Sequence, residues 1–145
     1  MRPGGVDAGA IARGGYVWRD VSTDVAASGE AVTIVATGSE VALALDAATL
    51  LAAEGTPVRV VSMPCVEAFL AQDVAWRDAV LPPGGRRVSL ELGRTLPWAA
   101  VVGADALHLG LDRFGASAPA GDLMKHMGFT PQDVADRIRR WSTIV

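Results

Sequence analysis

Residues 31–41 read Ala31-Val-Thr-Ile-Val-Ala-Thr-Gly-Ser-Glu-Val41. The first six residues are a short, largely β-branched run without alternation, which is typical of a strand buried on both faces of a sheet. Gly38 ends this run, and Ser39 is suited to cap a following helix. Apolar residues then recur at helical spacing until Gly55, which favours the end of the helix. The stretch therefore predicts a strand, a tight turn and a helix.

The alternation of strand and helix patterns continues beyond this unit. Strands are predicted at residues 16–18, 58–63, 87–92 and 107–111, and helical segments at residues 66–80 and from Thr130 onward. Thr130 is suited to cap the last helix, Pro131 fits its first position, and Asp133 complements the helix dipole. This alternation predicts a three-layer α/β fold with a mostly parallel sheet between helices.

The length and composition fit one domain with a single core. The chain has 145 residues, of which 50% are hydrophobic and 20% are charged, and this is enough apolar material for a packed interior. Residues 1–15 are predicted to form an N-terminal arm or linker, because glycines interrupt every short apolar run there. Residues 16–145 are predicted to form the domain itself.

Charge and cysteine content exclude several classes of function. The formal net charge is −3 and Lys125 is the only lysine, so we expect neither a nucleic-acid-binding surface nor a basic membrane anchor. No apolar run is long enough to span a bilayer, and a soluble cytoplasmic protein is expected. Cys65 is the only cysteine, which excludes an internal disulfide and a cysteine-rich metal cluster.

Gly38, Ser39 and Glu40 form the junction between the first strand and helix, and they are the candidate site for an anion. Backbone N–H groups at a helix N-terminus carry partial positive charge, and ligands of open α/β sheets bind at the carboxyl ends of strands. A purely structural role, with a turn at Gly38 and a cap at Ser39, is preferred on the residues alone. Neither a dinucleotide-binding glycine pattern nor a phosphate-binding loop with lysine is present.

Glu91 is the carboxylate of most interest, because it closes a predicted buried strand just before Gly93. A charge at a strand end can line a cleft, but it can equally face solvent or cap a helix. His108 is interpreted as a hydrogen-bonded strand residue and His126 as an exposed one, and their spacing fits no metal site. Cys65 is interpreted as a small packed side chain. No catalytic, cofactor-binding or metal-binding residue is predicted in this chain.

Several motifs, in the right order and at the right spacing, resemble the C-terminal domain of transketolases. They are Ala12–Val17, Ile34–Val41, Arg59–Pro64, Phe69 with Gln72–Asp73, Trp76–Arg77, Val80–Pro82, Phe114–Pro119 and Gly128–Thr130. The resemblance covers nearly the whole chain from about Ala12 onward. It implies a five-stranded, mostly parallel but mixed sheet between helices.

The resemblance also implies a function. Transketolases transfer a two-carbon ketol unit between sugar phosphates, with thiamine diphosphate and a divalent metal such as Mg²⁺. The family's cofactor and substrate residues lie mainly in the preceding domains, so this chain is expected to bind no cofactor. Its expected role is structural, in assembly, and it extends to regulation. Its expected partner is the cofactor-binding domains or subunit of transketolase, in a homodimer or a hetero-assembly. Candidate interface or cleft residues are Glu91, Gly93, Phe114 and Gly115.

Two segments depart from the family pattern. The family has an acidic-Ala-Gly turn and an aromatic-rich helix where this chain has Leu92-Gly-Arg-Thr-Leu-Pro-Trp98. Ala116 also stands where an acidic residue is common. These departures bear on the substrate range and on the interface, and they leave the core pattern intact.

Two alternatives stay open on the sequence. The chain could be a free-standing module that binds an anionic metabolite at the Gly38–Ser39 helix N-terminus. It could also belong to a related thiamine enzyme, a deoxyxylulose-phosphate synthase or the beta chain of the first component of a 2-oxo-acid dehydrogenase. Residues 36–41 and 61–64 fit transketolase better than these relatives.

Overall fold

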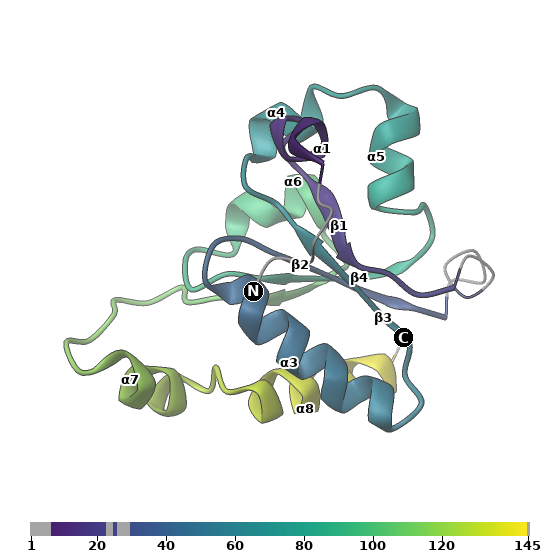
Figure 1. The fold of residues 1–145 in the computed structure, drawn as a ribbon. Coiled ribbons are helices and arrows are strands. Elements are labelled where there is room, and N and C mark those ends of the chain that lie inside the picture. Colours follow the sequence, from purple (N-terminus) through teal and green to yellow (C-terminus); the bar gives the residue numbers. More distant parts are fainter. Residues whose placement is uncertain (1–6, 23–24, 26–29, 145) are drawn as a thin grey trace.

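A five-stranded sheet with helices on both faces forms the centre of the molecule (Figure 1). The computed structural model describes residues 7–22, 25 and 30–144. The strands are β1 Tyr16–Arg19, β2 Val32–Ala36, β3 Val58–Ser62, β4 Arg86–Leu90 and β5 Leu107–Leu109. The helices are α1 Ala8–Ala12, α3 Glu40–Ala53, α4 Val66–Leu70, α5 Val74–Val80, α6 Ala99–Val102, α7 Ala120–Met127 and α8 Pro131–Ser142, and Leu96–Trp98 forms a 3-10 helix, η1. The predicted three-layer α/β fold is confirmed.

The sheet is mixed, with the strand order β1-β3-β2-β4-β5. In its parallel part, Ile34 of β2 pairs with Val60 of β3 and Val88 of β4. In the one antiparallel pair, Tyr16 at the start of β1 faces Ser62 at the end of β3. The carboxyl ends of β2, β3, β4 and β5 therefore share one edge, called the carboxyl edge below. Because β1 runs the other way, α1 and the start of β1 lie at this edge too.

Each face of the sheet has its own apolar core. Ile34 and Val60 point to the face that α3 and α8 cover, and α3 and α8 also pack against each other. Val35 and Val61 point to the opposite face, where they meet residues of α4, α5 and α6. Figure 1 shows these two sets of helices on opposite sides of the sheet. All five residues of β2 are buried, as the absence of polar alternation predicted.

The predicted helical segment at residues 66–80 is divided into α4 and α5. The division lies at Asp73, whose carboxylate accepts a hydrogen bond of 2.8 Å from the backbone N–H of Trp76 and so begins a new helix. The last helix starts as predicted, with Thr130 and Asp133 in a reciprocal capping box and Pro131 in the first turn. Within the described residues, no helix combines the length and the apolar character that crossing a membrane requires.

Part of the predicted N-terminal arm packs against the domain. Residues 1–6 lie outside the described residues, and α1 occupies most of the rest of the arm. The guanidinium of Arg13 lies 4.3 Å from the ring centroid of Trp76, and the carbonyl of Gly14 accepts a hydrogen bond of 3.0 Å from the N–H of Cys65. The boundary at residue 15 stays a prediction.

Candidate functional site

Three loops meet at the carboxyl edge, and between them lies a cavity of about 460 Å³. The loops follow β2, β3 and β4. Because Ala36 pairs with Leu90 across β2 and β4, the next residues, Thr37 and Glu91, occupy adjacent positions at the edge. Both line the cavity, as does Cys65 from the loop after β3. Ligands of open α/β sheets bind at this edge, so the cavity is the candidate site.

The cavity wall is mixed in character. Trp98 and Met63, both buried, contribute apolar surface, whereas Glu67, Glu91 and Arg94 contribute charge of both signs. The sequence analysis did not single out Glu67, Arg94 or Trp98 as site residues. A signal for Arg94 and Trp98 existed, because residues 92–98 depart from the family pattern and closely follow β4, which ends at the site.

Glu91 is the most unusual group in the cavity. Its side chain is half-buried, and its Oε2 atom is buried without a hydrogen-bond partner among the described residues. Burial raises the pKa of the Glu91 carboxyl, and the carboxylate of Glu40 raises this pKa further. Glu91 lines the cavity, and a functional role for it stays a prediction. Such a carboxyl group favours a bound proton or a hydrogen-bond donor from another molecule.

The structure brings Gly38, Ser39 and Glu40 together at the start of α3. Gly38 has a φ of +55°, so the turn requires a left-handed conformation that suits glycine. Ser39 occupies the N-cap position, but its backbone is already helical, with φ −67° and ψ −27°, and its side chain makes no capping bond. Its hydroxyl donates to Oε2 of Glu40 at 3.2 Å. The expected cap by the Ser39 hydroxyl is therefore wrong.

Two carboxylates stand near the predicted anion site. Glu40 is only 7% exposed and lies in the first turn of α3, where it already complements the helix dipole. It is also close enough to Glu91 to raise the pKa of that carboxyl. Gly38 and Ser39 line a second cavity, of about 390 Å³, together with Trp18 of β1. Anion binding here stays a prediction, and the negative charge of these carboxylates opposes it.

The other predicted interface residues divide between the cavity and a protruding segment. Gly93 lines the cavity, and its carbonyl accepts a hydrogen bond of 2.8 Å from the N–H of Leu111. Phe114 and Gly115 lie beyond β5, in a run from residue 112 to 122 in which every residue is exposed. Figure 1 shows this segment leading away from the sheet toward α7. The structure therefore does not bring the four residues into one site.

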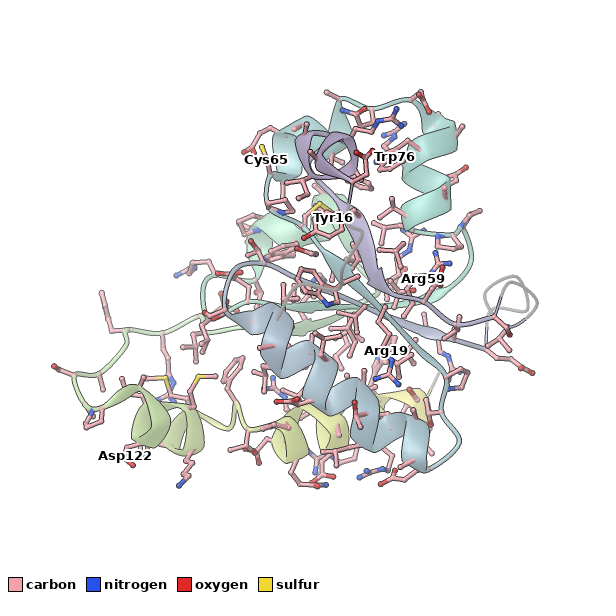
Figure 2. All side chains as sticks on the ribbon, viewed as in Figure 1. Tyr16, Arg19, Arg59, Cys65, Trp76 and Asp122 are labelled. Carbon is pink, nitrogen blue, oxygen red and sulfur yellow. The ribbon has the colours of Figure 1, made fainter. Side chains whose placement is uncertain are left out.

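Cys65 differs from its interpretation as a packed side chain. It is exposed, whereas Met63, which follows β3 directly, is buried in the core. Its Sγ lies 3.6 Å from Oε2 of Glu67. Figure 2 shows Cys65 on the outer side of the loop before α4.

His108 is a hydrogen-bonded strand residue, as interpreted. Its Nδ1 lies 2.9 Å from Oγ of Ser89 on the neighbouring strand β4. His126 is exposed on α7, also as interpreted. In the described part of the chain, no group of three or more His, Cys, Asp or Glu side chains could hold a metal ion.

This arrangement defines a three-layer α/β domain with an open carboxyl edge. Comparison with known proteins shows the family to which the chain belongs. Residues 14–130 match the family model of the transketolase-like TK C-terminal domain. The chain is 57% identical over 129 residues to the chromosomal transketolase of Cupriavidus necator, a match that covers 89% of this chain and 18% of that protein. It is 40% identical over 136 residues to a probable transketolase of Streptococcus pneumoniae, covering 93% and 20%.

Solved structures agree. Transketolase from Leishmania mexicana superposes with a TM-score of 0.83 at 41% identity, covering 97% of this chain and 19% of that one. A split-gene transketolase, described as an inactive beta4 tetramer, superposes with a TM-score of 0.67 at 26% identity, covering 91% and 43%. The chain therefore belongs to the family of transketolase C-terminal domains, and it spans about a fifth of the length of the curated relatives it matches.

Proposed function

We propose that this chain is the C-terminal, assembly-supporting part of a thiamine-diphosphate-dependent transketolase. The observation that carries the proposal is the match in which 89% of this chain corresponds to only 18% of a transketolase at 57% identity. In the intact enzyme, the remaining part would hold thiamine diphosphate and Mg²⁺ and would carry out ketol transfer between sugar phosphates. We place the enzyme in the cytoplasm, in the pentose phosphate reactions.

We assign no catalytic role to the described side chains of this chain. His108 is engaged with Ser89, and the cavity at the carboxyl edge holds carboxylates and a thiol but no histidine. A general base in catalysis needs an oriented partner and a substrate within hydrogen-bond reach. The partner of this chain would be the cofactor-binding part of transketolase, joined to it or separate, in a homodimer or a hetero-assembly.

The test is ketol transfer from xylulose 5-phosphate to ribose 5-phosphate with thiamine diphosphate and Mg²⁺. The chain is assayed alone and mixed with a C. necator transketolase lacking its own C-terminal domain, which circular dichroism must first show to be folded. We expect no turnover by the chain alone and higher turnover in the mixture than by the truncated relative. Turnover by the chain alone would refute the non-catalytic role.

The same preparation tests the alternative of a free-standing anion-binding module. Calorimetric titration of the isolated chain with inorganic phosphate should give no saturable heat, because Glu40 and Glu91 place negative charge at the carboxyl edge. Saturable phosphate binding that Gly38→Ala abolishes, together with no effect of the chain on the truncated relative, would favour the module.

A further inference from the structure

A third cavity, of about 260 Å³, lies on the face of the sheet that α4, α5 and α6 cover (Figure 1). Two arginines line it, Arg77 of α5 and Arg87 near the start of β4, together with apolar residues that include Phe69, Leu81 and Val101. Its volume is slightly below the usual range for pockets that hold drug-sized molecules. The cavity therefore suits a small ligand.

Arg77 has a guanidinium group without an acceptor. Its Nε atom is buried and has no hydrogen-bond partner among the described residues, and none of the ion pairs found among them includes Arg77. A buried donor without an acceptor costs free energy. A carboxylate matches a guanidinium best, because the two planar groups can form parallel N–H···O bonds. Since no such bond holds the Arg77 side chain, it can turn toward an acceptor in the cavity.

Arg87 supplies a second positive charge to the same cavity. One of its terminal nitrogens donates to the carbonyl oxygens of Leu81 and Pro82 at 3.0 and 2.8 Å, which fixes the guanidinium just after α5. Burial lowers the pKa of the Arg87 guanidinium, and the Asp78 carboxylate offsets this effect in part. Arg87 nevertheless stays charged at neutral pH. Its charge would therefore be better compensated with an anion beside it.

The charges around the end of α5 leave the cavity positive. Arg59 lies there too, but its Nε is 2.8 Å from Oδ1 of Asp20, and it also donates to two carbonyl oxygens of the last turn of α5. Asp78 is the only carboxylate among the described residues that line the cavity, and it is exposed, so solvent weakens its field. Arg77 and Arg87 thus face a single, screened negative charge.

We propose that this cavity binds a small organic carboxylate with a short apolar body. The carboxylate would bind to Arg77 beside the charge of Arg87, and the apolar body would lie against Phe69 and Val101, both of which are buried. Inorganic phosphate matches the cavity less well, because it has no apolar part and carries more charge near Asp78. This inference goes beyond the function proposed above and does not depend on it.

The experiment follows the backbone amide signals of the isotope-labelled chain by NMR during titration with isovalerate. Isovaleramide, which has the same shape without the charge, and inorganic phosphate, which has charge without an apolar body, are the control ligands. We expect isovalerate to shift the signals of Leu70, Leu81 and Val101 with a dissociation constant of about 1 mM, a reasonable affinity for so small a ligand. Both control ligands should bind at least about tenfold more weakly.

Arg77→Gln should weaken isovalerate binding about tenfold, the effect of losing one charge-assisted hydrogen bond. Arg140→Gln is the matched control, because it removes the same charge from an exposed position on α8, which covers the opposite face, and it should leave the affinity unchanged. Ala100→Phe should also weaken binding, since Ala100 is exposed and lines the cavity and the larger side chain narrows it. Thermal unfolding must show that each variant is folded, and Ala100→Phe carries the test if Arg77→Gln is not.

Several results would overturn the inference. No saturable shift with isovalerate would exclude the site. Isovaleramide binding as tightly as isovalerate would show that the guanidinium groups do not hold the ligand, and phosphate binding as tightly would show that the apolar wall does not contribute. Folded Arg77→Gln and Ala100→Phe variants that bind as the unchanged chain does would place the ligand elsewhere.

A second arm distinguishes a free carboxylate from a carboxylate side chain of a neighbouring domain. It uses a chimera in which this chain replaces the matching C-terminal region of C. necator transketolase, and saturation-transfer NMR detects isovalerate bound to it. A signal that Arg77→Gln reduces would support a free ligand. The absence of such a signal in a folded chimera would mean that the rest of the enzyme occupies the cavity, and the inference would fall. The turnover of the chimera, which tests the proposed function, is measured separately.

Discussion

At the scale of single residues, the charge of Glu91 at the carboxyl edge opposes folding. Its Oε2 atom is buried without a donor among the described residues, and the Glu40 carboxylate lies near it. Both the burial and this neighbour raise the pKa of Glu91 from its ordinary value of 4.5. A raised pKa means that the folded chain binds the proton more tightly than the unfolded chain does, so ionised Glu91 destabilises the fold.

Glu91→Gln should therefore stabilise the isolated chain at pH 7. The stability that protonated Glu91 contributes is fully present below its unfolded pKa and is lost as the pH rises through the higher folded value. The advantage of the variant should thus be small at pH 4 and grow toward pH 7, where we expect less than about 1 kcal/mol because solvent screens a half-exposed group. Urea unfolding of the variant and the unchanged chain at several pH values measures this difference in the free energy of unfolding.

Glu67→Gln is the matched control, since Glu67 lines the same cavity but is exposed. Its effect on the free energy of unfolding should be smaller than that of Glu91→Gln at pH 7. An advantage of Glu91→Gln that is the same at pH 4 and pH 7 would show that the Glu91 charge is not the cause.

Gly14 connects α1 to the domain at a point that admits no side chain. Its φ is +86°, and a Cβ there would overlap the carbonyl oxygen of Cys65 and the N–H of Phe69. Gly55 has the same φ of +86°, but a Cβ at that position would meet no other atom within 4 Å. The two glycines share a backbone strain and differ only in crowding.

Gly55→Ala should destabilise the chain by about 1 kcal/mol, the cost of a left-handed conformation for alanine. Gly14→Ala should cost several kcal/mol, because overlap with backbone atoms adds to that strain. Thermal unfolding of both variants gives the comparison. Equal losses at the two positions would mean that α1 does not pack against α4 in solution as it does in the structure.

At the scale of elements, the two long helices of one face begin in different ways. The hydroxyl of Thr130 accepts from the N–H of Asp133, and the carboxylate of Asp133 accepts from the N–H of Thr130. Ser39, at the start of α3, makes no capping bond. Tertiary burial between the sheet and α8 stabilises α3 instead, since Leu43, Ala44, Ala47 and Leu51 are buried there.

Thr130→Ala should therefore cost about 1 kcal/mol of stability, the usual loss of an N-cap side chain. Ser39→Ala should cost only a few tenths, because it removes just the contact with Glu40. Both values come from urea unfolding of the isolated chain. A loss for Ser39→Ala that matches the loss for Thr130→Ala would contradict the absence of a cap at Ser39.

The sequence pattern predicted the elements well where one local signal dominates. Residues 31–36 contained no polar alternation, and β2 is buried on both faces. Thr130 with Pro131 marked the start of α8. The pattern could not show that Ser39 donates to Glu40, because a free hydroxyl rotates toward whichever acceptor lies closest. It also could not show Cys65 as exposed, because tertiary packing decides whether a single apolar side chain is covered.

The candidate site was predictable in part. Glu91 was singled out from its place at a strand end, and it lines the cavity. Its proximity to Glu40 was not predicted, although both residues follow parallel strands that turn out to be neighbours, β2 and β4. Glu67 and Arg94, which also line the cavity, were missed because exposed charged side chains leave no periodic signal. The sequence pattern singled out individual site residues such as Glu91, and the strand order determines which of them lie next to each other.

At the scale of the whole molecule, the fold is complete while its carboxyl edge is open. Two apolar cores cover both faces of the sheet, yet Leu96 and Phe114 are exposed. The chain matches about a fifth of each transketolase relative. Exposed apolar side chains on a domain with closed cores are consistent with the proposed place beside other domains.

The most direct test of a non-catalytic C-terminal role is the turnover number of a chimera in which this chain replaces the matching C-terminal region of C. necator transketolase. Its substrates are xylulose 5-phosphate and ribose 5-phosphate. The isolated chain and the truncated relative are measured beside it. If the chain is a transketolase C-terminal domain without a catalytic site, the chimera should retain turnover within about tenfold of the intact relative, and the isolated chain should show none. A folded, cofactor-loaded chimera no more active than the truncated relative would contradict the account, as would ketol transfer by the isolated chain.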